Sequence, residues 1–381
     1  MLEFLDYEIL RLTWWALLGV LLIAFAVTDG FDLGVAMLLP FLGRSDNERR
    51  VLINSITPFW EGNQVWLILA AGAIFAAWPH IYAVSFSALY YIIMLMLISL
   101  ILRPVAFEYR SKINHPAWRT IWDWLIFSYG FSATFLFGVA VGNIIQGLSF
   151  SFNEFMVISY NHDFFSMFNE FSLLCGSLSV MMFLTHGACY LTVKTNRKIL
   201  IRARRVLAFS PFLLMSIFAI GALFVQFLPC YKVISSAGIY SDSNPLSKIV
   251  TVGIGCLEDN FEQYNWMWIA PAIVFILQIF IPLLTILFFF KTAFIFSTIS
   301  IAGIITTVGF AMFPIILPSK LDPKSSLTVW DASSSELTLF IMLIAVAIFM
   351  PLIVVYTSFI HKVMRGKITE NDIKKNSKSL Y

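Results

Sequence analysis

Long apolar stretches alternate with short polar segments along almost the whole chain. The pattern predicts membrane-spanning helices at residues 12–42, 82–107, 122–146, 164–193, 206–229, 266–290, 293–317 and 337–360. Each of these stretches has at least the roughly 20 residues that a helix needs to cross a bilayer. Residues 65–78 are also apolar, but they reach across only if the polar residues 60–64 join the helix and are buried against protein. The chain is therefore predicted to be an all-α polytopic membrane protein.

The number of spans follows from the positions of Lys and Arg, which are enriched in cytoplasmic loops. With eight helices the two termini lie on the same side, whereas nine helices place more of the 25 Lys and Arg inside. The basic segment 194–205 is then cytoplasmic, and the acidic start of the chain is outside. We predict about nine helices, with eight as the alternative, a periplasmic N-terminus and a cytoplasmic C-terminus. Residues 1–381 would form one integral membrane domain with a short basic tail at 361–381.

Composition agrees with this class of protein. The chain is 59% hydrophobic and 12% charged with a mean hydropathy of +0.84, whereas soluble domains carry about 25% charged residues. A net charge of +3 gives no indication of nucleic-acid binding. The first residues lack the basic region and small-residue cleavage site of a signal peptide, so the first apolar stretch is predicted to stay as a membrane helix.

Two acids interrupt the first predicted helix, and they are the first candidates for function. Asp29 and Asp32 lie three residues apart, so they share roughly one face of the helix. A carboxylate at the centre of a membrane helix costs about 2.5–3.5 kcal/mol on insertion scales. Either both acids accept hydrogen bonds from neighbouring helices, or they belong to a proton or ion path.

Other polar residues reach the same depth in the nine-helix arrangement. Glu61 lies in the polar segment 54–66, and Arg103 and Glu108 follow the apolar run 82–102. Together with Asp32 they are predicted to lie in the inner half of the membrane. Mixed acids and an Arg are typical both of a proton relay and of a plain ion-pair network, and the residue pattern does not separate the two.

Histidines and cysteines give little sign of a metal or haem site. Only His186 lies within a predicted span, while His80, His115, His162 and His361 fall in loops or at helix ends. A single intramembrane His is more often a helix contact than a haem ligand. The four cysteines form no CxxC pair. Cys230 and Cys256 share an outer loop, as a disulfide or as two thiols. We predict no metal site and no catalytic residue in this chain.

Several longer motifs carry a resemblance to a known family. They are Asp6-Tyr7-Glu8 with Trp14-Trp15, residues 28–32 and 54–66, Arg103-Pro104-Val105, Tyr109-Arg110-Ser111-Lys112, Ala311-Met312-Phe313-Pro314, residues 327–332 and the terminal Ser379-Leu380-Tyr381. With these motifs the chain resembles subunit II of the cytochrome bd-type ubiquinol oxidases of bacterial respiratory chains. The resemblance extends over essentially the whole length.

The resemblance implies a function at the level of a complex. Such an oxidase oxidises membrane quinol, reduces O2 to water and generates a proton motive force in the bacterial inner membrane. Subunit I, the partner in an obligate heterodimer, would supply the quinol site and the ligands of haem b and haem d. Subunit II would have two four-helix bundles and a peripheral helix, stabilise the haem region, and deliver cytoplasmic protons to the oxygen site. A quinone bound as a structural lipid and a small accessory subunit are further features of the family, and neither is assigned residues here.

The resemblance also assigns the candidate site residues. The proton path would use Asp29 or Asp32, Glu61 and Glu108, with Trp60 and Arg103 as neighbours. Glu61 and Glu108 stand where the family pattern has Asp; a Glu keeps the carboxyl group and adds one methylene. Two other functions remain open from the residues alone. One is a proton-coupled secondary transporter, although no two related halves are evident. The other is a purely structural partner of subunit I.

Overall fold

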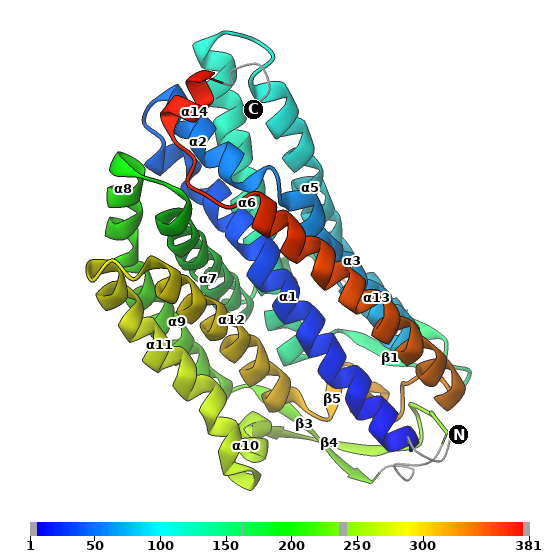
Figure 1. Ribbon diagram of the computed structural model, residues 1–381. Helices are drawn as coiled ribbons and strands as arrows, with labels where there is room; N and C mark the ends of the chain where they lie inside the picture. The colour runs from blue at the N-terminus through cyan, green and yellow to red at the C-terminus, as the bar shows by residue number, and fades with distance from the viewer. Residues whose placement is uncertain (1–5, 162, 236–241, 376–381) are drawn as a thin grey trace.

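The computed structural model describes residues 6–161, 163–235 and 242–375, and long antiparallel helices dominate it (Figure 1). His162 and the terminal motif Ser379-Leu380-Tyr381 lie outside these residues. Within the described residues, eight helical segments are long and apolar enough to cross a membrane, which confirms the predicted class. They are α1 (Tyr7–Leu42), α5 (Tyr90–Arg110), α6 (Pro116–Gln146), α7 (Glu170–Lys194), α8 (Arg197–Leu207) followed by α9 (Ser210–Val225), α11 (Ile269–Ile286) with the turn before it, α12 (Phe290–Met312) and α13 (Glu336–Val363).

A further helix, α3 (Trp60–Ala77), forms where the doubtful segment was predicted. It is not among the eight candidate spans, because the polar residues at its start lower its mean hydropathy. Hydrogen bonds nevertheless hold both ends of α3 against the bundle. Near its start Asn63 donates to the carbonyl of Thr28 in α1. At its end the carbonyls of Ala76 and Ala77 accept from Ser334, just before α13. The start of α1 and the C-terminal helix α14 (Glu370–Lys375) lie at opposite ends of the bundle (Figure 1).

Helix α1 is the centre of the molecule. Residues 29–39 of α1 are all buried, so this part of the helix is surrounded by protein on every side. The helices pack in two groups of four, matching the architecture that the resemblance implies. The first group is α1, α3, α5 and α6; the second is α7, α8–α9, α11 and α12. Helix α13 stays at the edge, with Leu339 as its one buried residue.

The two groups meet along α7, which packs against both α6 and α1, and α1 crosses α7 at a pair of glycines. A Cβ atom on Gly187 would lie 2.6 Å from the carbonyl carbon of Gly34, and one on Gly34 would collide with the backbone of Phe183. Small residues allow this close backbone approach, which is the usual way that membrane helices associate. The α1–α7 contact therefore depends on the absence of two side chains.

Shorter elements cover the two ends of the bundle. At the N-terminal end lie the hairpins β1 (Phe150–Phe152) with β2 (Ile158–Tyr160), β3 (Pro229–Ser235) with β4 (Ile249–Ile254), and β5 (Ile315–Leu317) with β6 (Leu327–Thr328). The remaining helices are α2 (Asp46–Ile56), α4 (Pro79–Ala88), α10 (Asp259–Gln263) and α14 (Glu370–Lys375). Four predicted span ends were therefore too long: residues 164–168, 226–229, 287–289 and 315–317 are a 3-10 turn, a turn entering β3, the turn before α12, and β5.

Cys230 and Cys256 form a disulfide, which decides between the two alternatives for this pair. Their Cα atoms are 5.7 Å apart, and the bond ties β3 to the short helical turn after β4. The bond lies at the same end of the molecule as the other hairpins (Figure 1). Cys175 and Cys189 are free thiols in α7.

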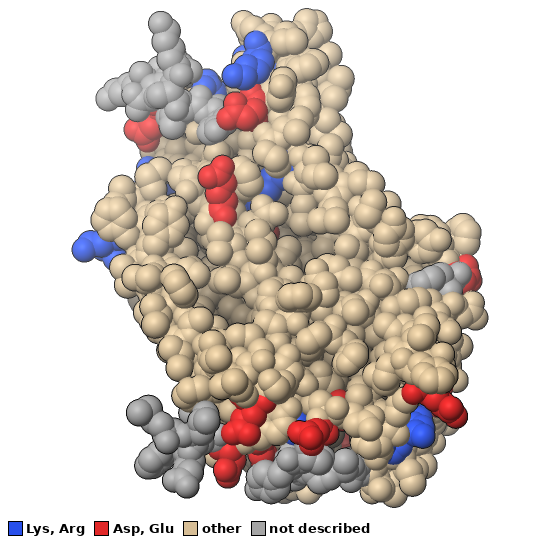
Figure 2. All heavy atoms as spheres, turned by 90° about the vertical axis from the view of Figure 1, so that its right-hand side faces the viewer, with Lys and Arg blue, Asp and Glu red and all other residues tan. Residues whose placement is uncertain are grey.

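The surface differs between its middle and its ends. In Figure 2 a broad middle zone is almost without charge, while Asp and Glu gather at the N-terminal end and Lys and Arg appear mainly at the opposite end. Large apolar side chains are exposed along α5, α9, α11 and α13. An uncharged zone between two charged ends is what lipid contact requires.

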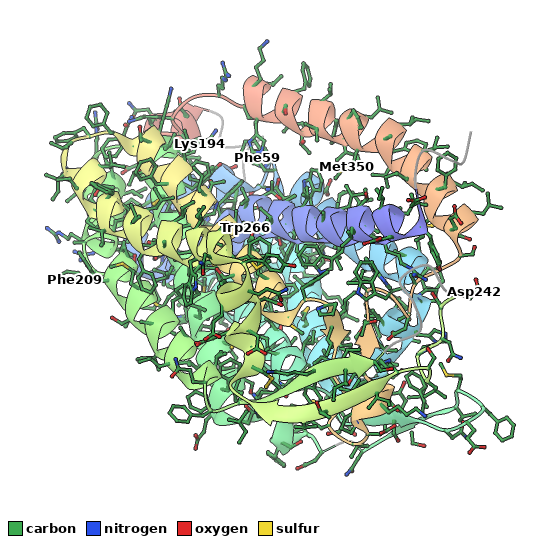
Figure 3. All side chains as sticks on the ribbon, turned by 90° about the horizontal axis from the view of Figure 1, so that it is seen from below. Phe59, Lys194, Phe209, Asp242, Trp266 and Met350 are labelled. Atoms are coloured by element: carbon green, nitrogen blue, oxygen red, sulfur yellow. A yellow bond between two sulfur atoms is a disulfide. The ribbon has the colours of Figure 1, made fainter. Side chains whose placement is uncertain are left out.

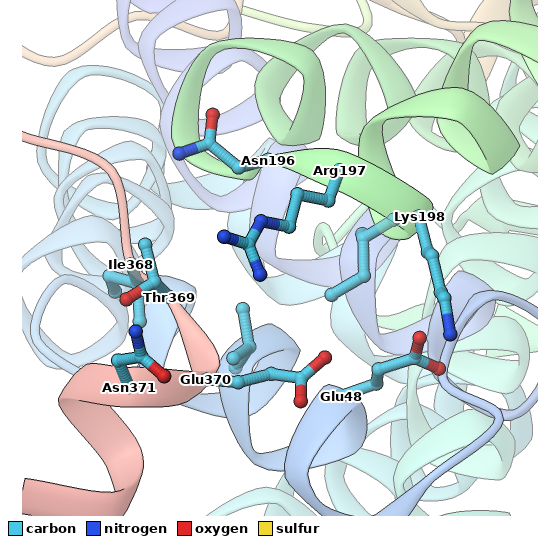
Figure 4. Close-up of a pocket in the computed structure, with 10 residues that line it drawn as sticks. Glu48, Asn196, Arg197, Lys198, Ile368, Thr369, Glu370 and Asn371 are labelled. Carbon is cyan, nitrogen blue, oxygen red and sulfur yellow. The ribbon is translucent and has the colours of Figure 1, made fainter.

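At the basic end, the segment after α13 folds back over α2 and the start of α8. It closes a pocket of about 150 Å³ whose lining includes Glu48, Arg197, Lys198 and Glu370 (Figure 4). Glu48 closes a capping box with Ser45 at the start of α2, and Arg202 donates to both of its carboxylate oxygens, at 2.8 and 3.1 Å. Burial alone would raise the pKa of Glu48, but the hydrogen bonds from Arg202 and from the backbone outweigh it and lower that pKa.

We expect Glu48→Gln to lower the stability of the protein by about 2 kcal/mol at neutral pH, because hydrogen bonds to a charged group are lost. Since the folded pKa lies below the unfolded one, this stability is present above the ordinary pKa of Glu and is lost as the pH falls through the folded value. Thermal unfolding of the purified complex should show a constant gap to wild type from pH 7.5 down to the ordinary pKa of Glu, 4.5, and a closing gap below it. Glu370→Gln, at an exposed position of the same pocket, serves as the control; an equal loss there would contradict the role of Glu48.

Candidate functional site

The two acids of α1 meet a single arginine in the interior of the first helix group. Asp29 Oδ1 lies 2.7 Å from Arg103 Nη2, and Asp32 Oδ2 lies 3.4 Å from the same nitrogen. None of the three side chains is exposed to any extent. Arg103 reaches them from α5 one residue before Pro104, which lies inside the helix. The spacing of three residues in α1 thus directs both carboxyl groups toward one partner.

A third helix completes the cluster through an amide. Asn63, in the first turn of α3, donates to Asp32 Oδ2 at 2.8 Å and to the carbonyl of Thr28 at 3.1 Å. The second oxygen of Asp32, Oδ1, is buried without a hydrogen-bond partner among the described residues. Buried polar atoms are nearly always hydrogen-bonded, and water serves where protein does not. Asp29 thus contacts Arg103 through Oδ1, and Asp32 contacts Asn63 through Oδ2, while the second oxygen of each acid has no hydrogen-bond partner among the described residues.

Aromatic rings enclose the guanidinium group. Its carbon lies 5.5 Å from the ring centre of Trp60 and 5.6 Å from that of Tyr129, which is fully buried on α6. Rings at this distance attract a cation, and more strongly where water is excluded. The cluster therefore joins α1, α3, α5 and α6.

One cation faces two carboxyl groups in this interior. A buried ion pair is balanced only while both partners are present, and removing one leaves an uncompensated charge at a cost of about 3–5 kcal/mol. Chemically, the arrangement is able to hold helices together, and it also places a second carboxyl group beside an already neutralised pair.

The two predicted glutamates do not join the cluster. Glu61 and Glu108 are exposed on α3 and α5, and Glu108 lies 3.8 Å from Lys112 with 52% of its side chain exposed. Glu61 directly follows Trp60, and Glu108 directly follows Phe107. The rings of Trp60 and Phe107 contact each other at the border of the cluster, with centres 6.4 Å apart. The structure thus brings Asp29, Asp32, Arg103 and Trp60 together and leaves Glu61 and Glu108 on the adjoining surface.

A second ionic network lies near the end of the same helices and was not anticipated. Asp123, buried on α6, accepts from Arg110 at 2.6 Å and from Arg49 at 2.7 Å. Asp46 pairs with Arg110 and Arg119, at 3.0 and 2.9 Å. The one available signal was a charged residue inside the predicted span 122–146, and the sequence interpretation passed over it. Tyr129 carries no such signal, because aromatic residues are common throughout these helices.

His186 is engaged by protein on both ring nitrogens. Nδ1 lies 2.9 Å from Ser297 Oγ on α12, and Nε2 lies 3.0 Å from the carbonyl of Val27 on α1. Its ring stacks on Phe294, with centres 4.8 Å apart. It is therefore a contact between α7, α1 and α12. Among the described residues no three His, Cys, Asp or Glu side chains are grouped as metal ligands would be.

Another aromatic contact closes the basic end of the first helix group. Phe59 stacks on His361 of α13 with ring centres 4.5 Å apart, and the Lys194 ammonium lies 5.1 Å from the Phe59 ring centre. Figure 3 shows Phe59 and Lys194 close together beneath α13. This contact fixes the start of α3, one residue before Trp60.

The sequence is similar to known proteins over almost its whole length. The family model described as cytochrome bd terminal oxidase subunit II matches residues 10–364. The chain is 46% identical to the cytochrome bd-I ubiquinol oxidase subunit 2 of Escherichia coli strain K12, covering 99% of this chain and all of that one. It is 44% identical to a probable cytochrome oxidase subunit 2 of Haemophilus influenzae, with the same coverage. The Bacillus subtilis cytochrome bd ubiquinol oxidase subunit 2 is 30% identical over 94% of this chain and 97% of that one.

The fold is also similar to that of a bd oxidase chain. The structure of the bd oxidase from Geobacillus thermodenitrificans contains a chain that matches with a TM-score of 0.67. The match covers 93% of this chain and 98% of the other, at 18% sequence identity. At that identity the likeness concerns the fold.

Proposed function

Because the chain belongs to the family of cytochrome bd terminal oxidase subunit II, we propose that it works as the second subunit of a bacterial quinol oxidase, paired with a haem-bearing subunit I. The complex would oxidise ubiquinol, reduce O2 to water and build a proton motive force. Subunit I would ligate haem b and haem d, since the one buried His of the described spans is fully occupied. The identity to named oxidase subunits favours this role over a secondary transporter.

Three observations support the orientation that we propose for the chain in the membrane. The eight candidate spans together with α3 give nine crossings, which matches described ends on opposite sides of the bundle. The disulfide suits the oxidising periplasm. The basic segment from Lys194 to Arg205 suits the cytoplasm. The N-terminus is therefore periplasmic, and the segment after α13 is cytoplasmic.

The second proposed role is proton delivery, and the buried acid pair carries it. One guanidinium neutralises one carboxylate, so a neutral cluster holds a proton on the other acid. Asp32 is the better site for that proton, because its carboxyl group lies farther from Arg103 than that of Asp29, at 3.4 Å against 2.7 Å. Glu61 and Glu108 would pass protons on the adjoining surface. Charged groups facing lipid are costly, so this surface would face subunit I.

The test compares two isosteric changes in one helix. If Asp32 relays protons, Asp32→Asn in the assembled oxidase lowers the O2-reduction rate about tenfold or more, because proton-transfer groups contribute roughly 10²–10⁴-fold to rates. Asp29→Asn should instead reduce complex stability and haem content, because Asp29 is the closer partner of Arg103. Rates and haem spectra are measured on the same preparations.

Glu61→Gln and Glu108→Gln extend the test to the surface. Both are expected to slow oxygen reduction while haem content stays normal. Glu336→Gln, an exposed acid at the opposite end of the molecule, is the control and should leave the rate unchanged. Unchanged rates in Asp32→Asn and both surface variants would remove proton delivery from the proposal and leave a structural subunit.

A further inference from the structure

A second pocket opens on the outer surface between α8 and α11, away from the acid cluster. It has a volume of about 250 Å³. Its lining combines two cations with apolar groups: Ile201, Arg204, Arg205, Ala208, Pro282, Thr285 and Ile286. No acidic residue is among them, which distinguishes it from the pocket beside Glu48 and Glu370.

The pocket lies at the level where a membrane meets water. It borders the C-terminal end of α11, next to the turn that leads into α12. Large apolar residues are exposed around it, with Phe209 at 77% and Phe288 at 66%. Figure 3 shows Phe209 at the outer edge of the molecule. Basic residues beside exposed aromatic ones are typical of the headgroup region of a bilayer.

The two arginines of the pocket differ from Arg202 in their ion pairing. Arg202 forms an ion pair with Glu48, whereas among the described residues Arg204 and Arg205 form no ion pair. Arg204 lies with its guanidinium carbon 4.6 Å from the Phe288 ring centre, which leaves its edge available to an anion. Two such groups at one apolar opening attract an anion strongly, and Arg binds phosphate oxygens in a bidentate manner.

An apolar strip leads from the pocket toward the membrane interior. Ile279, Pro282 and Ile286 follow one another at spacings of three and four residues, so they share one face of α11. Ile279 is 53% exposed and Ile286 61% exposed. A hydrocarbon chain lying along this face would start at the two arginines.

We propose that this pocket binds an anionic phospholipid, with its phosphodiester between Arg204 and Arg205 and one acyl chain along Ile279, Pro282 and Ile286. Basic pockets between membrane helices on the cytoplasmic side suit this class of lipid. A free phosphate ion would satisfy the arginines alone and leave the apolar strip unused. The site is independent of proton delivery, since it lies on the second helix group.

The test uses the assembled oxidase in lipid nanodiscs. The thermal midpoint of unfolding and the lipids retained in native mass spectrometry are measured in phosphatidylcholine with and without phosphatidylglycerol. Wild type should retain phosphatidylglycerol selectively and show a higher midpoint with it. In the double variant Arg204→Gln, Arg205→Gln, retention should fall at least about fivefold, in line with the loss of charge-assisted hydrogen bonds, and the shift in midpoint should disappear.

Two further arms separate this site from general surface attraction. Lys291→Gln removes an exposed charge from the first turn of α12, outside the pocket lining, and should leave retention unchanged. Ala208→Trp fills the groove while keeping both arginines, and should lower retention as the double variant does. Inorganic phosphate alone should not raise the midpoint. Equal retention in wild type and the double variant, equal losses in Lys291→Gln, or stabilisation by phosphate alone would overturn the proposal.

Discussion

Replacing Arg103 with Gln is expected to keep the protein from accumulating in an assembled oxidase. The change leaves Asp29 and Asp32 in a fully buried site without a cation. Leaving a buried charge unpaired costs about 3–5 kcal/mol, a large part of the stability of an ordinary domain. The measurement is the amount of this chain in purified complex, relative to wild type, together with its resistance to thermal unfolding.

A double variant separates the effect of the unpaired charge from the effect of the altered side-chain packing. Arg103→Gln combined with Asp29→Asn removes both partners of the 2.7 Å ion pair, so it should recover part of the assembled complex. The two amide side chains introduced in this way are both neutral and able to hydrogen-bond to each other. If Arg103→Gln assembles as well as wild type, or if the double variant is worse than the single one, the ion pair does not support the fold.

The second large effect is expected at the crossing of α1 and α7. In Gly34→Ala the new methyl group would collide with the backbone of Phe183 and lie 2.9 Å from Gly187 Cα. Because both obstacles are backbone atoms, the helices must separate. Overpacking costs typically about 1–3 kcal/mol, and here it also loosens the contact between the two helix groups. Less assembled complex and a lower thermal midpoint should be seen.

Gly19→Ala is the matched control on the same helix, since a Cβ atom there would have nothing within 4 Å. Alanine is the better helix former by about 1 kcal/mol, so the control should be neutral or slightly stabilising. Equal stability of Gly34→Ala and Gly19→Ala would show that α1 and α7 adjust to the extra methyl group without cost.

The long helices were predictable because the membrane imposes one length and one polarity on each of them. Composition does not define the residue at which a helix ends outside the hydrocarbon region of the membrane. Residues 315–317 are as apolar as the helix before them, yet they form β5, because Thr328 in β6 pairs with Ile315. Such pairing depends on segments distant in the sequence, and a local pattern carries no information about it.

The acid cluster was predictable in part for the same reason. A charge in a membrane helix needs a partner, which singled out Asp29, Asp32 and Arg103. The direction of Glu61 was not predictable, because neighbouring positions on a helix point about 100° apart and the start of α3 is polar on several sides. The sequence pattern therefore identified charged residues of the cluster, but it did not predict the directions in which the neighbouring acidic side chains point.

The central position of α1 has a consequence for synthesis of the chain. Asp29 and Asp32 enter the membrane with the first helix, whereas Arg103 follows 74 residues after Asp29. At roughly 5–20 residues per second, the acids wait about 4–15 s for their cation. During this interval only Asn63, which precedes Arg103 in the chain, offers Asp32 a hydrogen bond, and neither carboxyl group has its cation. Completion of α5 is thus the step of synthesis that first brings a cation to the two acids of α1.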